Sequence, residues 1–506
     1  MADAVAGAPE TGALGERRLG TIHAVAQALA IGPMFSTALV LGGTSNPATG
    51  SGFNAALSVV FAGLGVLAIA YALSLFARRY AGAGAVYEYL THGAHPAVGV
   101  FTAGLFFVGT LFLGGGGIYL GLGILANGFW TEHISSGAPA WWVFALILLA
   151  VVLVLNYLGV RIATRVMLLF AAISFVPMII LAFVIIAKGG HGGNTGAPFD
   201  PTTTSVGTIF NGILLGILLF VGFEAAASIG EESHDPYRSI PRGLLWTVAV
   251  SAVFYMVMAY AISIGYGRAA VSAGKWAGDP AYLDTMAHQY IGSWYATIID
   301  LIVLLDATGL ALAICVTIGR GYFALGRDGL LPSVFAKTSK RFHTPWVGNL
   351  MVVVGCVGLI IISEGTGWMN KFVPIFGSKS FSTFIVSATA GSFAIEFVYL
   401  ILAVAAIPFL MRIGGKWWQY LIVLVAIAMP ILGFKGALGP APHDSSNYAW
   451  LAFYWALFVV VLSAAWFMLM QLWKPERIKA AAAHAAEHHG VPPIDEDTDF
   501  RPLPEA

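Results

Sequence analysis

The chain has 506 residues, of which 58% are hydrophobic and only 10% are charged. Its mean hydropathy of +0.83 lies far above that of soluble globular proteins, so the composition predicts an all-α polytopic membrane protein. The 25 basic and 25 acidic residues cancel, which argues against nucleic acid as a partner.

Twelve apolar segments are long enough to span a membrane, because about 30 Å of hydrocarbon takes roughly 20 helical residues. The stretch from Phe372 to Leu410 is too long for one span, and we expect a short external or re-entrant lead followed by one long helix. Residues 1–18 and 474–506 are predicted to be disordered cytoplasmic tails. The predicted spans are residues 19–42, 53–76, 98–126, 140–157, 165–187, 206–230, 244–266, 294–319, 347–363, 381–410, 418–434 and 449–472.

The distribution of basic residues supports this count. With both termini in the cytoplasm, 19 of the 25 lysines and arginines fall on the inner side and 6 on the outer side. That asymmetry follows the positive-inside rule. A miscounted helix would reverse the side of every later loop, so the even count and the orientation support each other.

The sequence offers little for catalysis. The longest internal loops, around 188–205, 267–293 and 320–346, are too small for a catalytic domain. No nucleotide-binding loop or nucleophile motif is present. Cys315 and Cys356 lie in apolar runs without metal-ligand spacing and are expected to be free buried thiols. We therefore expect no enzyme, no cofactor and no metal.

Two spans are interrupted at corresponding places. Gly32 and Pro33 lie about 14 residues into the first span, and Gly222 lies about 16 residues into the sixth. Ordinary kinks are one explanation, since Gly and Pro are frequent in membrane helices. Paired breaks in the two halves of a secondary transporter instead mark its binding site. The matched pair, with Glu224 beside the second break, favours a site.

Several carboxylates lie inside apolar runs, which makes each a candidate functional residue. A charged side chain at mid-bilayer costs roughly 2.5 to 3.5 kcal/mol on insertion scales. Glu224 follows the second break, Asp300 and Asp306 lie in the eighth span, and Glu396 lies in the tenth. Alternatively, Glu224 stays protonated and binds backbone groups freed beside Gly222. These two interpretations overlap.

Three stretches carry a family resemblance. Residues 222–242, GFEAAASIGEESHDPYRSIPR, contain G-F-E, E-E and P-x-R-x-I-P-R in order. Residues 319–332, GRGYFALGRDGLLP, are followed by a Thr-Pro pair at 344–345. Residues 71–90, YALSLFARRYAGAGAVYEYL, match a further family segment, with Ala81 in place of its usual proline. The chain resembles the amino acid, polyamine and organocation (APC) permease superfamily.

The resemblance implies a leucine-transporter-type bundle, with two inverted five-helix repeats in residues 19–410 and two further helices in 411–473. It also implies that residues 30–36, AIGPMFS, hold a substrate carboxylate through backbone N–H groups, although Pro33 lacks one. An aromatic residue is frequent in the family where this chain has Leu218. The implied substrate site comprises Ile31, Gly32, Pro33, Met34, Phe35, Ser36, Tyr119, Leu218, Phe220, Val221, Gly222, Phe223 and Glu224.

The coupling ion is left open by the sequence. Glu224 or Asp306 can carry a proton, or the hydroxyls of Ser174 and Thr317 can help to bind sodium, or exchange needs no ion. Some relatives use a lysine at the position that falls on Ser174 here. H⁺ is the expected coupling ion.

A cytoplasmic gate is the last implied feature, with Arg327 and Asp328 contacting Glu231 or Glu232 and with Arg238 and Arg242 in the same signature. We expect a secondary permease that moves amino acids or related amines across the lipid of the cytoplasmic membrane by alternating access. The alternatives are a polyamine or ethanolamine-like organocation permease, and a channel or sensor without turnover.

Overall fold

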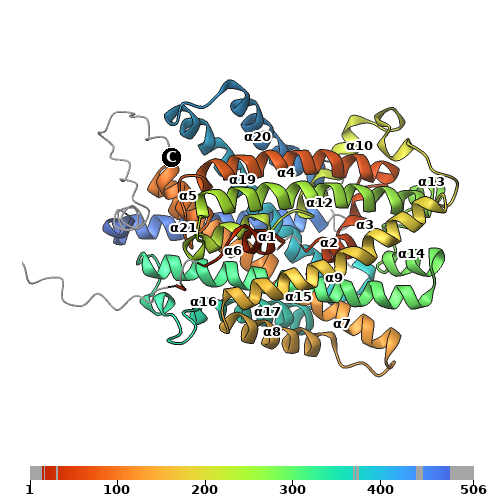
Figure 1. The fold of residues 1–506 in the computed structure, drawn as a ribbon, viewed down its shortest axis with the longest axis horizontal. Coiled ribbons are helices and arrows are strands. Elements are labelled where there is room, and N and C mark those ends of the chain that lie inside the picture. Colours follow the sequence, from red (N-terminus) through yellow and green to blue (C-terminus); the bar gives the residue numbers. More distant parts are fainter. Residues whose placement is uncertain are drawn as a thin grey trace, which may run out of the picture.

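The computed structural model describes residues 14, 15, 18–29, 32–367, 371, 375–439 and 448–478, without the side chains of residues 113–115 and 376 (Figure 1). In this part of the chain every regular element is a helix, apart from one isolated bridge between Leu19 and Ser233. The predicted all-α class is confirmed.

Membrane-length helices dominate the described residues. The two shorter apolar helices, α6 (Pro96–Thr110) and α8 (Trp141–Tyr157), coincide with the predicted spans 98–126 and 140–157, so each of the twelve predicted spans has a helical counterpart. Ten segments are long and apolar enough to cross a bilayer by themselves: Thr21–Leu39, Gly52–Ala77, Val160–Ala187, Val206–Glu232, Pro236–Tyr266, Ser293–Arg327, Trp346–Thr366, Lys379–Arg412, Trp417–Leu438 and Tyr448–Trp473.

The bounds of the individual helices follow chain order. The first five spans and their connections contain α1 (Thr21–Ala28), α2 (Pro33–Leu39), α3 (Leu41–Thr44), α4 (Ala55–Ala77), α5 (Val86–Gly93), α6, the π-helix η3 (Leu111–Ile118), α7 (Tyr119–His133), α8 and α9 (Val160–Ala187). The remaining chain contains α10 (Val206–Asn211), α11 (Ile213–Leu218), the 3₁₀-helix η6 (Phe223–Glu232), α12 (Pro236–Tyr266), α13 (Arg268–Ser272), α14 (Tyr282–Tyr290), α15 (Ser293–Arg327), α16 (Trp346–Asn349), α17 (Met351–Ile360), η8 (Ile361–Thr366), α19 (Lys379–Arg412), α20 (Trp417–Leu438) and α21 (Tyr448–Trp473).

The helices pack in pairs that repeat after five spans. The first span contacts the sixth (α1 with η6), and the second contacts the seventh (α4 with α12). The third contacts the fourth (α7 with α8) and the tenth (η3 with α19), while the eighth contacts the ninth (α15 with α16) and the fifth (α15 with α9). Exchanging each span of one half for its counterpart five places away therefore turns the pair 3–4 into 8–9 and the pair 3–10 into 8–5, and leaves the pairs 1–6 and 2–7 unchanged. Since five crossings reverse the direction through a membrane, the repeats are inverted, as expected for a leucine-transporter-type bundle.

Both predicted interruptions are present. In the first span α1 ends at Ala28 and α2 begins at Pro33, after Gly32 with φ of +55°. In the sixth span α11 ends at Leu218 and η6 begins after Gly222, whose φ is +117°. Residues with a Cβ rarely adopt these angles, whereas glycine does so at little cost. Pro33 suits the first position of α2, because an N–H group there would have no partner within the helix.

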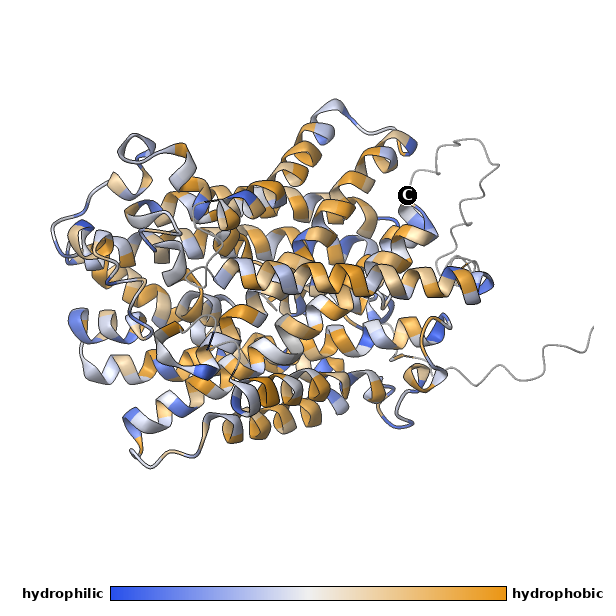
Figure 2. Ribbon diagram, turned by 180° about the vertical axis from the view of Figure 1, so that it is seen from behind, coloured by the Kyte–Doolittle hydropathy of each residue, from blue (hydrophilic) through white to orange (hydrophobic). Residues whose placement is uncertain are grey.

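Hydrophobic residues occupy most of the length of the helices, and hydrophilic residues gather toward the helix ends and the loops, as Figure 2 shows. Large hydrophobic side chains lie exposed on several helices, among them Phe183, Trp246 and Val461. Such a surface suits lipid rather than water. The chain is an integral membrane protein.

Three features differ from the expectation or fall outside it. The predicted long helix of the tenth span is present as α19, with 34 residues. Residues 372–374 of its expected lead lie outside the described residues, and the rest includes the short 3₁₀-helix η9 (Ile375–Gly377). The sequence did not predict the short helices α5 and α14, which lie between spans. The predicted disordered tails also lie almost wholly outside the described residues.

Candidate functional site

A small cavity lies between the two interruptions. Its volume is about 30 Å³, which holds roughly two water molecules. An amino acid does not fit, so this structure is a closed form of the site. The walls come from the first, third, sixth, eighth and tenth spans: Phe35, Ser36, Val40, Ile118, Leu218, Val221, Leu310, Ile314, Phe384 and Ala388.

Asp306 occupies the N-terminus of α2. The backbone N–H groups of Met34 and Phe35 donate to its Oδ2 atom at 2.9 and 3.0 Å. These donors belong to the first turn of a helix, where N–H groups have no partner within the helix and the positive end of the helix dipole favours an anion. The carboxylate is 4% exposed. Asp306 therefore occupies the two N–H donors that, according to the family resemblance, bind a substrate carboxylate.

Leu310 lies beside this contact, one turn further along α15. A Cβ atom at Gly32 would approach its Cδ2 atom to 2.7 Å. Leu310 lines the main cavity and also a second cavity of about 10 Å³ that reaches Asp306. Its side chain therefore separates Asp306 from the main cavity in this closed form.

Glu224 binds the second interruption from within. Its Oε2 atom accepts from the N–H of Gly222 at 3.0 Å and from the hydroxyl of Tyr399 at 2.7 Å. The side chain is 3% exposed and does not line the main cavity. This contact with Gly222 is the one expected if Glu224 binds backbone groups freed by the interruption. No sequence pattern singles out Tyr399, because a tyrosine in an apolar helix is common.

Glu396 lies one turn before Tyr399 on α19. It is 0% exposed, and neither carboxylate oxygen has a hydrogen-bond partner among the described residues. A Cβ atom at Gly433 of α20 would lie 3.2 Å from its Oε2 atom. Glu396 is thus a buried carboxylate packed against a neighbouring helix.

The family follows from comparison with known proteins. A model of the family described as "Amino acid permease" matches residues 25–469 of the chain. The chain belongs to the amino acid permease family. This confirms the family resemblance and makes the protein a transporter rather than an enzyme.

Relatives of the permease differ in the substrates that their names state. A branched-chain amino acid permease of Bacillus subtilis is 26% identical over 341 residues, or 63% of this chain and 70% of the relative. A methylthioribose transporter of the same organism is 25% identical over 442 residues, covering 79% and 89%. A low-affinity putrescine importer of Escherichia coli is 24% identical over 316 residues, covering 60% and 66%.

Other expected substrate residues of the permease support the walls of the cavity. Tyr119 does not line it: its hydroxyl donates to the carbonyl of Ala311 at 3.2 Å, and the preceding Ile118 takes the lining position. The π-helix η3, which ends at Ile118, changes the register of the third span. Phe220 packs edge-on against Tyr255 and Phe223 lies beside Tyr399, both buried. Ile31 lies outside the described residues.

The hydroxyls considered for sodium do not meet. Ser174 donates to the carbonyl of Ile302 at 3.0 Å. Thr317 donates to the carbonyl of Ala313 at 3.1 Å. Ile302 and Thr317 are fifteen residues apart on α15, or about 22 Å at 1.5 Å per residue. The structure therefore gives no support to one sodium site formed by both.

Of the expected cytoplasmic contacts, the one between Arg327 and Glu231 is present and belongs to a network around Arg327, whereas Asp328 binds Tyr87 instead of Glu231 or Glu232. The Nη1 atom of Arg327 donates to both oxygens of Glu231 at 2.9 and 3.0 Å, and its Nη2 atom donates to Glu88 at 3.3 Å. Asp328 accepts from the hydroxyl of Tyr87 at 2.7 Å. Burial raises the pKa of Asp328 to about 7, although the neighbouring Arg327 opposes the rise.

A second ion pair extends this network to the N-terminal segment. Arg320, which is 2% exposed, lies 2.6 Å from Glu232. The backbone carbonyl of Glu232 accepts from the N–H groups of Arg18 and Leu19, both at 3.0 Å. Four segments thus meet here: the N-terminal segment, the α5 region, the end of η6 and the end of α15. We call these contacts the cytoplasmic network, after the side of the membrane on which the sequence analysis expects them.

Arg238 and Arg242 do not join the cytoplasmic network in the described part of the chain. Arg238 is exposed and lies 4.0 Å from Asp235 on its own helix. Arg242 is exposed on α12. The structure therefore gives neither arginine a role in the expected gate.

Proposed function

We propose that the permease imports small amino acids together with protons, across the plasma membrane and with both termini in the cytoplasm. The observation that carries this proposal is the carboxylate of Asp306 on the two N–H groups of α2. A carboxylate already sits where the first turn of a helix favours an anion. A substrate carboxylate can take its place once Asp306 becomes neutral.

Uptake of a proton makes Asp306 neutral. A proton added to Asp306 removes its negative charge and weakens its bonds to Met34 and Phe35, because charge-assisted hydrogen bonds are about twice as strong as neutral ones. The freed N–H groups then bind the substrate carboxylate. One proton and one zwitterion enter the site together, so the cycle carries one net positive charge inward.

The surroundings suit a substrate with an apolar side chain. Phe35, Leu218, Val221 and Ile314 give the cavity an apolar wall. The name of the branched-chain amino acid relative supports the same class. Because the closed cavity is too small, the α2 and η6 segments must move apart to admit the substrate, which is the motion that broken helices permit.

The test is uptake of labelled amino acids into proteoliposomes with an imposed proton gradient. Wild-type protein should accumulate leucine or a similar amino acid in a saturable, gradient-dependent way. Asp306→Asn should exchange internal for external substrate but should not accumulate it, because asparagine carries no titrating charge. Asp300→Asn, on the same helix but outside the cavity, is the matched control and should keep accumulation. Gradient-driven accumulation by Asp306→Asn would refute this role.

An amine permease is the second candidate, and the same contact favours it. If Asp306 never leaves α2, the site offers the Asp306 carboxylate but no free anion-binding donors, which suits a cation without a carboxylate. The name of the putrescine importer supports this class. Saturable uptake of putrescine or ethanolamine, without uptake of any amino acid, would establish it. Absence of saturable flux for the whole panel would point to a channel or sensor.

A further inference from the structure

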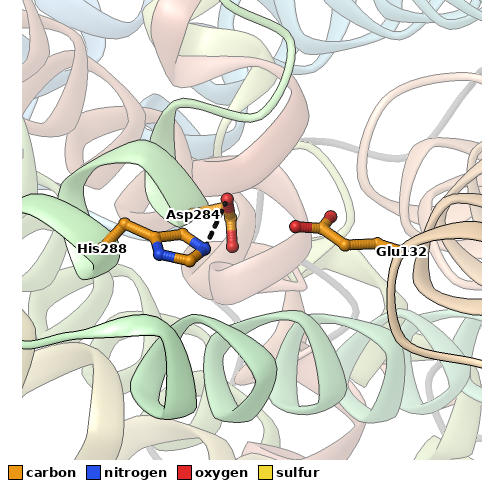
Figure 3. A group of neighbouring side chains, drawn as sticks. All are labelled: Glu132, Asp284 and His288. Carbon is orange, nitrogen blue, oxygen red and sulfur yellow. Dashed lines mark ion pairs between the residues drawn. The ribbon is translucent and has the colours of Figure 1, made fainter.

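Carboxylates and imidazoles from three helices converge at the end of the bundle opposite the cytoplasmic network. The donor atoms of Glu132, Asp284 and His288 all lie within 4.8 Å of one another. Figure 3 shows the three side chains pointing toward one another, with Glu132 on α7 and the other two on α14. His133 and Asp300 form a neighbouring pair that shares Glu132 with this group.

One oxygen in the group lacks a partner. The Oδ2 atom of Asp284 lies 3.6 Å from Nε2 of His288. Its Oδ1 atom is buried and has no hydrogen-bond partner among the described residues. Buried carboxylate oxygens are nearly always paired with a donor or an ion. The neighbouring pair needs no such ion, because His133 lies 2.9 Å from Asp300 and its other ring nitrogen contacts Thr297.

The distances between the ligand atoms suit a metal ion with tetrahedral coordination. With bonds of about 2.0 to 2.2 Å, the ligand atoms of a zinc ion lie roughly 3.3 to 3.6 Å apart. Asp284 and His288 already have this spacing. Glu132 is exposed, so its side chain is free to move the remaining ångström or so. One nitrogen and two oxygens favour zinc or a similar transition ion over calcium, which takes oxygen ligands.

The electrostatics also favour a cation. The Glu132 and Asp284 carboxylates lie close together, and Asp300 belongs to the neighbouring group that shares Glu132. A divalent ion relieves this crowding of negative groups. His288 is 44% exposed, so an ion reaches the group directly from solvent.

We propose that Glu132, Asp284 and His288 form a binding site for Zn²⁺, with water completing the coordination. The ion ties the end of α7 to α14, which directly precedes α15. It therefore restrains the third span against the eighth at their outer ends. This site is independent of the transported substrate.

The test is titration of purified full-length protein in detergent with zinc chloride, followed by calorimetry and by melting temperature. Wild type should bind one ion and melt at a higher temperature when zinc is present. His288→Ala and Glu132→Gln should each weaken binding at least about tenfold, in the range seen when a metal site loses a supporting group. His191→Ala, an exposed histidine outside the group, should bind zinc like wild type.

Three other outcomes would overturn the proposal. Absence of binding below millimolar zinc removes the site. Binding that survives both variants places the ion elsewhere. Binding that is lost in His133→Ala but kept in His288→Ala assigns the ion to the neighbouring pair. Glu132 and His288 are exposed, and size-exclusion profiles of both variants will show whether their fold is intact.

Discussion

The three carboxylates buried in the membrane region differ in what holds them. Asp306 accepts two backbone N–H groups, and Glu224 accepts one N–H and one tyrosine hydroxyl. Glu396 has no partner among the described residues. Since an unpaired buried polar group costs more than a paired one, the three should respond differently to replacement by an apolar residue.

Replacing Glu396 should therefore stabilise the permease. We expect Glu396→Leu to raise the free energy of unfolding by roughly 1 to 3 kcal/mol, because it removes an unsatisfied buried group. Glu224→Leu is the matched variant and should lower stability, since it leaves the Tyr399 hydroxyl and the Gly222 N–H without their acceptor. Melting temperatures in detergent measure both. A lower melting temperature for Glu396→Leu would contradict the absence of a partner.

Asp328 should make stability depend on pH. Its folded-state pKa is raised to about 7 from the ordinary 3.8, so the folded protein binds more protons than the unfolded chain between pH 4 and 7. Stability should then fall as pH rises through that window, by at most about 4 kcal/mol at 1.36 kcal/mol per unit. Asp328→Asn should flatten this dependence and melt higher than wild type at pH 8. An equally steep pH profile for the variant would exclude Asp328 as its source.

At the scale of single residues, the buried carboxylates could be located from the sequence, but the groups that bind them could not. Glu224, Asp306 and Glu396 stand out because each interrupts an apolar run. Tyr399 does not stand out, and the resemblance assigned the N–H groups of α2 to a substrate rather than to Asp306. Only the packing of α19 and α15 brings these partners to the carboxylates. Tyr119 was expected at the cavity, whereas Ile118 lines it in this structure, and the π-helix that sets this register has no clear sequence signature.

Our proposal makes transport depend on the two broken helices. Gly32→Ala should reduce both stability and uptake, because the new Cβ meets Leu310 at 2.7 Å at a φ of +55°. Strain of this kind costs roughly 1 to 3 kcal/mol. Gly128→Ala in α7 is the control, since a Cβ there meets nothing within 4 Å, and it should be neutral or slightly stabilising. Wild-type uptake by Gly32→Ala would show that the interruption tolerates a side chain.

Helices and their interruptions were predicted correctly where the length of an apolar run, or a glycine or proline within it, indicated the structure. The twelve spans and both interruptions were visible for that reason. The short helices α5 and α14 were not, because their few turns are held by burial in the fold rather than by their own periodicity. All eight residues of α5, for example, are buried.

At the scale of the whole molecule, the cytoplasmic network joins four segments at one end of the bundle. Arg327→Gln should loosen this end, because a hydrogen-bonded charge is worth about 1.5 to 3 kcal/mol. In a variant without native cysteines, a cysteine at the buried Ala83 should then react roughly tenfold faster with a water-soluble maleimide. Arg238→Gln is the control, as Arg238 lies outside the network and is exposed. Equal labelling rates would mean that the network does not hold this end closed.

The pairing of the third span with the tenth bears on how the protein is made. Lys379, where α19 begins, follows the end of η3 at Ile118 by roughly 260 residues. At about 5 to 20 residues per second, synthesis of that stretch takes roughly 13 to 50 s. Throughout that time the surface of η3 that will meet α19 borders lipid or an insertion factor. We therefore expect that neither half matures when expressed alone, and that the two halves complement each other when co-expressed.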